Sequence, residues 1–119
     1  MIINDPILTR FRYDLDAVYG NRLERVVLFG SRARGDARPD SDYDVAVFLN
    51  NYSDFRKESD ALSNIEFDIM YDTDAIINSL PFPAGAYREG TTPLMYELRR
   101  EGVDLYNSEG GRNADQGQL

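Results

Sequence analysis

The chain contains neither cysteine nor histidine among its 119 residues. Without cysteine, it has no disulfide framework and no thiolate metal site. Without histidine, it has no imidazole base and no zinc site of the usual kind. Any catalysis by this chain must therefore use carboxylates, hydroxyl groups, arginines and a bound metal.

Long apolar segments are missing as well. The hydrophobic residues, 42% of the chain, are too few and too dispersed for a membrane span. Charged residues in the first twenty positions leave no room for a signal-peptide core. We therefore expect a cytoplasmic protein that does not bind a membrane.

Acidic residues outnumber basic ones by 21 to 13, which gives a net charge of −8. This balance argues against binding along a nucleic-acid backbone, because such binding needs a broad cationic surface. We expect no direct nucleic-acid contact, and the charge favours a basic protein as a partner.

The length allows one domain with one core. From Asn107 onward the sequence is rich in Gly, Asn, Gln and Ser, a composition typical of disorder. We predict a domain over residues 1–106 and a disordered tail over 107–119.

Local patterns predict an α/β (α+β) fold, a mixed β-sheet flanked by helices. Asp5-Pro6 and Thr92-Pro93 each read as a helix cap followed by proline, with glycine stops at Gly20 and Gly102. Residues 32–36 are predicted as a helical turn, 50–64 as a helical crossover and 74–80 as a short helix, whereas strands are predicted over 26–29, 42–49, 65–71 and 103–106.

The segment from Gly30 to Gly35, Gly-Ser-Arg-Ala-Arg-Gly, follows the buried strand directly. Glycine permits a tight turn, and Ser31 offers a backbone N–H and a hydroxyl to a phosphate. Arg32 and Arg34 can neutralise phosphate charge, although each has a nearby acid with which it could pair instead. On its own, such a turn is also common without any ligand.

Two acids, Asp42 and Asp44, follow this turn closely. Two residues apart on a strand, they point to the same face, where unpaired carboxylates repel each other. A divalent cation relieves this repulsion, and Mg²⁺ is commonly held by one or two carboxylates together with substrate phosphates. The alternative is a strand end that carries exposed acids.

A third acid, Asp68, lies in the predicted strand 65–71, on a face matching that of Asp42 and Asp44. A carboxylate there could accept the proton of an attacking hydroxyl and share a metal. Glu66 lies on the same face and is the rival candidate.

The joint pattern resembles the DNA polymerase β-like nucleotidyltransferase superfamily. The resemblance rests on Gly30–Gly35, on Ser41-Asp42-Tyr43-Asp44 and on Asp68 in the position of a third carboxylate, and it covers most of residues 23–106. The short length resembles the minimal nucleotidyltransferase (MNT) group.

The resemblance implies a palm-like fold that binds ATP and Mg²⁺ through Gly30, Ser31, Arg32, Arg34, Asp42 and Asp44, with Asp68 as a further catalytic and metal-binding residue. It implies transfer of a nucleotidyl group to a hydroxyl. Members of the minimal group are often antitoxins of helical HEPN-domain RNase toxins, and some transfer AMP to a tyrosine of the toxin. Because no second domain follows residue 106, we expect a partner to supply the acceptor.

Two other functions stay open. The chain could neutralise a toxin by binding alone, or it could modify a small molecule at an acceptor site formed by a homodimer.

Overall fold

The computed structural model describes residues 4–108. Within them the chain forms one four-stranded sheet in the order β3-β2-β1-β4, made of β1 (Leu23–Phe29), β2 (Tyr43–Leu49), β3 (Ile77–Pro83) and β4 (Val103–Asn107). Strand β1 runs antiparallel to β2 and β4, whereas β3 runs parallel to β2. The sheet is therefore mixed, as predicted.

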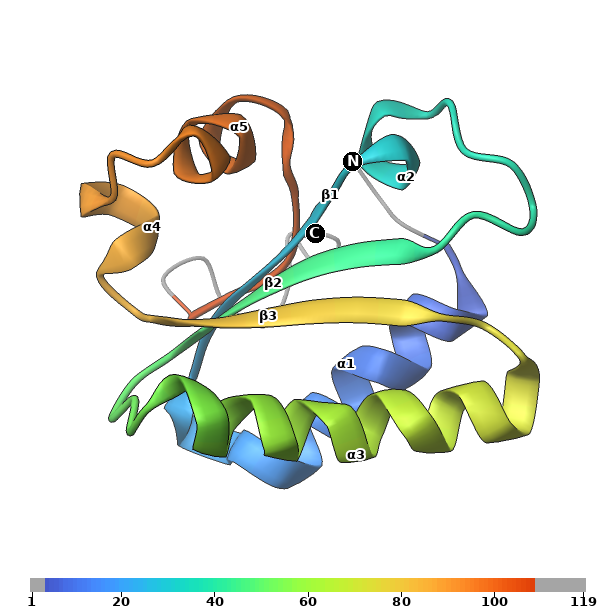
Figure 1. The fold of residues 1–119 in the computed structure, drawn as a ribbon, viewed down its shortest axis with the longest axis horizontal. Coiled ribbons are helices and arrows are strands. Elements are labelled where there is room, and N and C mark those ends of the chain that lie inside the picture. The colour runs from blue at the N-terminus through green and yellow to red at the C-terminus, as the bar shows by residue number, and fades with distance from the viewer. Residues whose placement is uncertain (1–3, 109–119) are drawn as a thin grey trace.

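Helices cover both faces of this sheet (Figure 1). One face carries α1 (Pro6–Tyr19) and α3 (Phe55–Thr73), and the other carries α4 (Ala86–Glu89) and α5 (Pro93–Glu101). The short helix α2 (Ser31–Arg34) lies at the end of β1, where Ala33 packs against the α1 side of the core. A 3₁₀ turn, η1 (Gly20–Arg22), joins α1 to β1. In the described part of the chain, no helix combines the length and apolarity that a membrane crossing requires.

Both predicted helix starts are confirmed. The Asp5 carboxylate accepts a hydrogen bond from the backbone N–H of Ile7 at 2.8 Å, and α1 begins at Pro6. The Thr92 hydroxyl accepts one from the N–H of Met95 at 3.3 Å, and α5 begins at Pro93. Side-chain oxygens thus satisfy backbone donors that have no partner within the helix.

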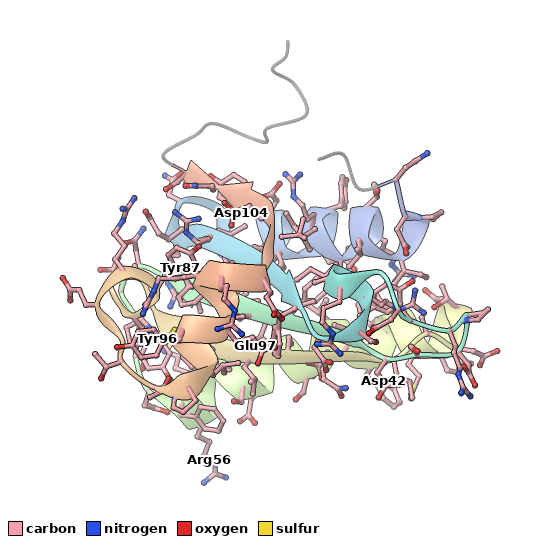
Figure 2. All side chains as sticks on the ribbon, turned by 90° about the horizontal axis from the view of Figure 1, so that it is seen from above. Asp42, Arg56, Tyr87, Tyr96, Glu97 and Asp104 are labelled. Carbon is pink, nitrogen blue, oxygen red and sulfur yellow. The ribbon has the colours of Figure 1, made fainter. Side chains whose placement is uncertain are left out.

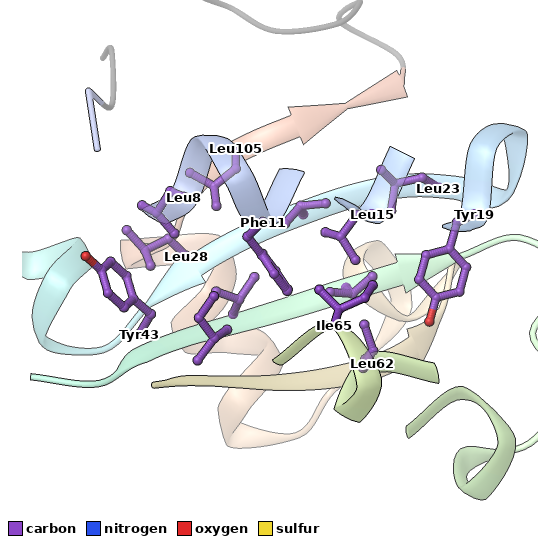
Figure 3. Packing of buried hydrophobic residues seen from close by; sticks show 14 of the residues in the cluster. Leu8, Phe11, Leu15, Tyr19, Leu23, Leu28, Tyr43, Leu62, Ile65 and Leu105 are labelled. Atoms are coloured by element: carbon purple, nitrogen blue, oxygen red, sulfur yellow. The ribbon is translucent and has the colours of Figure 1, made fainter. Parts of the chain in front are cut away.

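The alternation predicted for residues 42–49 divides the core into two layers. Tyr43, Val45, Val47 and Leu49 pack with buried residues of α1 and α3, several of which are seen in Figure 3. Ala46 and Phe48 face the opposite way, toward Met95 and Leu98 of α5. Because side chains alternate along a strand, Asp42 and Asp44 share the face of Ala46 and Phe48.

The predicted strand over residues 65–71 is wrong, because this segment belongs to α3. The buried side chains of α3 are Glu58, Leu62, Ile65 and Ile69, a spacing of three and four residues that is typical of a helix. Phe67 and Tyr71, which made the segment look like an alternating strand, are 61% and 81% exposed. Their apolar character therefore does not mark the core.

The predicted helix over residues 74–80 is also wrong, because the chain there enters β3. The backbone N–H of Tyr43 donates to Ile76 O, and that of Ala84 donates to Leu49 O, so even-numbered residues of this stretch pair with β2. The backbone nitrogens of the odd-numbered residues point away from β2, toward the open edge of the sheet. Pro81 and Pro83 have no N–H there, which is why an edge strand tolerates them.

The predicted edge strand near the end of the domain is confirmed as β4, which lies at the other edge of the sheet. Of the predicted tail, Asn107 ends β4, and residues 109–119 lie outside the described part of the chain.

Candidate nucleotide and metal site

The turn after β1 brings Gly30 against Asp44. Gly30 has a φ of +74°, a backbone conformation that residues with a side chain rarely adopt. A β-carbon placed on Gly30 would lie 2.5 Å from Oδ2 of Asp44. Only glycine fits here, because it permits both the turn and the close approach of the carboxylate.

Beyond Gly30 the chain forms the single turn of α2. The amide groups of Ala33 and Arg34 donate to Gly30 O at 3.1 Å each. The amide groups of Ser31 and Arg32 lie in the first turn and have no acceptor within the helix. The turn therefore presents two backbone donors and the Ser31 hydroxyl next to the Asp44 carboxylate.

Asp42 and Asp44 meet a third polar side chain, Asn78 of β3. In the parallel pairing of β2 with β3, Asn78 lies beside Asp44. Its Nδ2 is 3.1 Å from Oδ2 of Asp42 and 3.4 Å from Oδ1 of Asp44. Figure 2 shows Asp42 toward one end of the sheet, with Tyr87 and Tyr96 toward the other.

Arg32 contacts the loop that leads to Asp42. Its guanidinium donates to Ser41 O at 2.8 and 3.0 Å and to Pro39 O at 3.1 Å. Its Cζ lies 3.8 Å from the centre of the Tyr43 ring. These contacts hold the backbone before Asp42 and the ring of the residue after it, whereas the sequence predicted that this arginine binds phosphate.

Tyr43 ties the same loop to α1. Its hydroxyl donates to Oδ2 of Asp5 at 2.8 Å, while Oδ1 of Asp5 caps α1. Burial raises the pKa of Tyr43 to about 12, and the bond to Asp5 adds to the effect. The ring under Arg32 is therefore neutral at physiological pH.

Arg34 is more exposed than Arg32, and it pairs with Asp36 at 3.4 Å. An exposed pair of this kind is weak, so its guanidinium can turn toward a bound anion at little cost. Arg34 thus stays a candidate for the predicted phosphate-binding arginine.

Asp68 does not join this site, and its predicted placement beside Asp42 and Asp44 needs correction. It is an exposed residue of α3, the helix whose buried side chains pack on the Tyr43 face of β2. Asp42 and Asp44 lie on the other face. Within residues 4–108, no third acid completes a group that could hold a metal ion.

The rival acid, Glu66, also lies elsewhere. Its carboxylate accepts hydrogen bonds from the backbone N–H of Ser79, at 2.8 Å, and from the Ser79 hydroxyl. Glu66 therefore caps the open edge of β3 and holds α3 against it.

Sequence reasoning missed Asn78 because it placed residues 74–80 in a helix. Once β3 is recognised as the neighbour of β2, the register alone puts position 78 beside Asp44. The signal available in the sequence was the pair of prolines, Pro81 and Pro83, which is compatible with an edge strand.

The arrangement fits a nucleotide with a divalent cation. Two carboxylates on one face of a strand end are the ligands that Mg²⁺ prefers, and phosphate oxygens complete such a site. A turn directly beside them, whose first amide groups have no acceptor within α2, suits a phosphate group.

Family comparison gives the decisive observation. The family model described as "Polymerase beta, Nucleotidyltransferase" matches residues 17–109, which include the turn, both aspartates and β3. The chain belongs to the polymerase beta nucleotidyltransferase family.

A curated relative of this nucleotidyltransferase comes from Methanocaldococcus jannaschii and is described as "Putative protein adenylyltransferase MJ0141". The two are 29% identical over 69 residues, which are 54% of this chain and 70% of the relative.

Solved structures share the fold. A structure described as a toxin–antitoxin with AMP-PNP matches with a TM-score of 0.63 and 20% identity over 84% of this chain and 73% of that one. A mutant of the toxin–antitoxin MntA-HpeT matches with a TM-score of 0.62 and 18% identity over 88% and 74%.

Proposed function

We propose that this nucleotidyltransferase is an Mg²⁺-dependent adenylyltransferase that transfers AMP from ATP to a hydroxyl group of a partner protein. The observation that carries the proposal is the close approach of Gly30 and Asp44, which puts a turn suited to a phosphate beside a carboxylate pair. The resemblance to the M. jannaschii relative supports a protein as the acceptor.

The partner we propose is a HEPN-family RNase toxin that offers a tyrosine, so that the chain acts as an antitoxin in the cytoplasm, where ATP is available. The toxin–antitoxin complexes that share the fold support this choice, and so does the net charge of −8, which complements a basic RNA-binding surface.

In the proposed reaction the phenol oxygen of the partner bonds to the α-phosphorus of ATP. The bond from that phosphorus to the bridging oxygen of the β-phosphate breaks, pyrophosphate leaves, and the phenol proton passes to solvent. A divalent cation, when bound, offsets the negative charge on the phosphates.

The residues of this chain bind and orient the substrate. Asp42 and Asp44 would hold the cation, and the backbone donors at Ser31 would hold a phosphate. Arg34 would add positive charge from the exposed side. Arg32 would hold the loop before Asp42 in place through its bonds to Ser41 O and Pro39 O. Asp68 has no role in the proposed site.

The test is the intact mass of the partner after incubation with the chain, ATP and Mg²⁺. The partner to test is the product of a neighbouring reading frame, chosen for a short, all-helical sequence. We expect mass gains equal to one or more AMP units, which Asp42→Asn and Asp44→Asn abolish and the control Asp40→Asn, in the same loop, leaves unchanged.

Two results would contradict the proposal. Neutralisation without any mass gain, unchanged by both asparagine variants, would assign the chain to binding alone. Adenylylation of small acceptors in the absence of the partner, with none of the partner itself, would assign it to small-molecule chemistry.

A further inference from the structure

Asn78 contacts one oxygen of each carboxylate in the Asp42–Asp44 pair. Its amide nitrogen approaches one oxygen of each acid, Oδ2 of Asp42 and Oδ1 of Asp44. The other oxygen of each carboxylate takes no part in these bonds. On Asp44 that other oxygen is Oδ2, the atom nearest to the Gly30 turn.

We infer that Asn78 is a positioning residue that holds the two carboxylates open toward the Gly30 turn for one divalent cation. The inference rests on the proposed function, since it concerns the cation of the same site. It goes further by assigning a role to Asn78 and by fixing the number of cations.

The first argument is electrostatic. Two carboxylates side by side repel each other, and a donor shared between them offsets part of that repulsion. An amide NH₂ has two donor hydrogens, so one asparagine side chain can serve both acids at once. Its fixed position on β3, in register with Asp44, holds the pair before any cation arrives.

The second argument concerns the number of ions. Asp42 and Asp44 supply two negative charges, and the amide of Asn78 adds none. One Mg²⁺ is usually held by one or two carboxylates together with substrate phosphates, so this pair supplies the protein ligands of one ion. An amide also does not accept a proton at neutral pH, so Asn78 is not a base for the acceptor hydroxyl.

The experiment counts Mn²⁺ ions by electron paramagnetic resonance, with Mn²⁺ as the probe and AMP-PNP as a nucleotide that does not turn over. It compares the wild-type chain with Asn78→Asp, Asn78→Ala and Asn78→Ser. The matched control is Asn64→Asp, which adds the same charge at an exposed position of α3, on the other face of the sheet.

We expect one Mn²⁺ per wild-type chain. Asn78→Asp should bind Mn²⁺ about tenfold more tightly and accept a second ion, because ligand charge sets affinity. Asn78→Ala and Asn78→Ser should bind one ion several-fold more weakly, and Asn64→Asp should match the wild type. Thermal unfolding without metal verifies that each variant folds, and the serine variant is the milder change if alanine unfolds.

The inference is overturned if the substitutions at position 78 leave both the number of Mn²⁺ ions and their affinity unchanged while Asp42→Asn abolishes binding. That result would leave the proposed function intact. If the wild-type chain binds no Mn²⁺ with AMP-PNP, the proposed function itself fails, and the inference fails with it.

Discussion

Gly30 and Asp44 approach each other so closely that a β-carbon on the glycine would lie 2.5 Å from a carboxylate oxygen of the aspartate. The two residues come from neighbouring strands that run in opposite directions, with the turn after β1 next to the start of β2. This contact joins the turn that we propose binds phosphate to the aspartate that we propose binds a cation.

Gly30→Ala should disable the site. The left-handed backbone disfavours alanine by about 1–3 kcal/mol, and the new methyl group displaces the Asp44 carboxylate. We expect affinity for AMP-PNP with Mg²⁺, measured by calorimetry, to fall by roughly tenfold or more. Gly20→Ala is the control, because Gly20 also has a positive φ but has open space around it. Equal losses in both variants would mean that strain alone, and not the contact with Asp44, matters.

Arg32→Ala should loosen the loop before Asp42. The guanidinium holds the carbonyl groups of Ser41 and Pro39, so its loss frees residues 36–42. We expect faster amide hydrogen exchange across this loop, together with weaker nucleotide binding. Arg34→Ala serves as the comparison, since Arg34 pairs with Asp36 at the surface and does not hold the carbonyl groups of Ser41 and Pro39. Weaker binding with unchanged exchange would instead indicate that Arg32 contacts phosphate directly.

Glu58→Ala should destabilise the fold at the end remote from the site. The Glu58 side chain is 2% exposed, and it accepts from Arg22 at 2.5 Å and from the Ser53 amide at 3.1 Å. Its removal leaves the Ser53 amide without this acceptor and takes the carboxylate away from Arg22, which keeps its bonds to Asn50 O and Asn51 O. We expect a cost of roughly 2–3 kcal/mol, since Arg22 stays partly solvated. Chemical denaturation measures this loss, and Asp60→Ala, an exposed acid of the same helix, should change stability little.

The fold should lose stability above pH 10. Burial raises the pKa of Tyr19 to about 12, with Glu58 nearby adding to the effect, and burial does the same for Tyr43. Both phenols stay protonated in the folded state up to about pH 12, whereas those of the unfolded chain release their protons from about pH 10. The contribution of these two tyrosines to the unfolding free energy is therefore constant below pH 10 and falls between pH 10 and 12.

Tyr19→Phe and Tyr43→Phe separate the two contributions. The Tyr19 hydroxyl is buried, and within residues 4–108 it has no hydrogen-bond partner, so its removal should cost nothing at pH 7. Tyr43→Phe loses the bond to Asp5, worth about 1 kcal/mol. Each change should flatten the alkaline decline in denaturation experiments, and a decline as steep as that of the wild type would contradict the assignment.

Much of the site could be predicted from the sequence because its parts are local. The turn at Gly30 and the spacing of Asp42 and Asp44 on one strand depend only on neighbouring residues. The caps at Asp5 and Thr92 are local as well, and they set α1 and α5 correctly.

The segment from residue 55 to 83 could not be predicted in the same way, because its apolar residues are not all in the core. Phe67 and Tyr71 are exposed, but in the sequence they complete an alternating apolar pattern that is typical of a strand. The helical spacing of the buried Leu62, Ile65 and Ile69 is therefore masked. The prolines of β3 suggested a helix end, and only the pairing with β2 reveals that their ring nitrogens face an open edge.

The most direct test of the account is a crystal structure of the chain with AMP-PNP and Mn²⁺, with the metal located by its anomalous scattering. We predict one peak between the carboxylates of Asp42 and Asp44, with the phosphates against the turn at Gly30 and Ser31. A peak away from these aspartates, or a nucleotide bound elsewhere on the chain, would contradict the account.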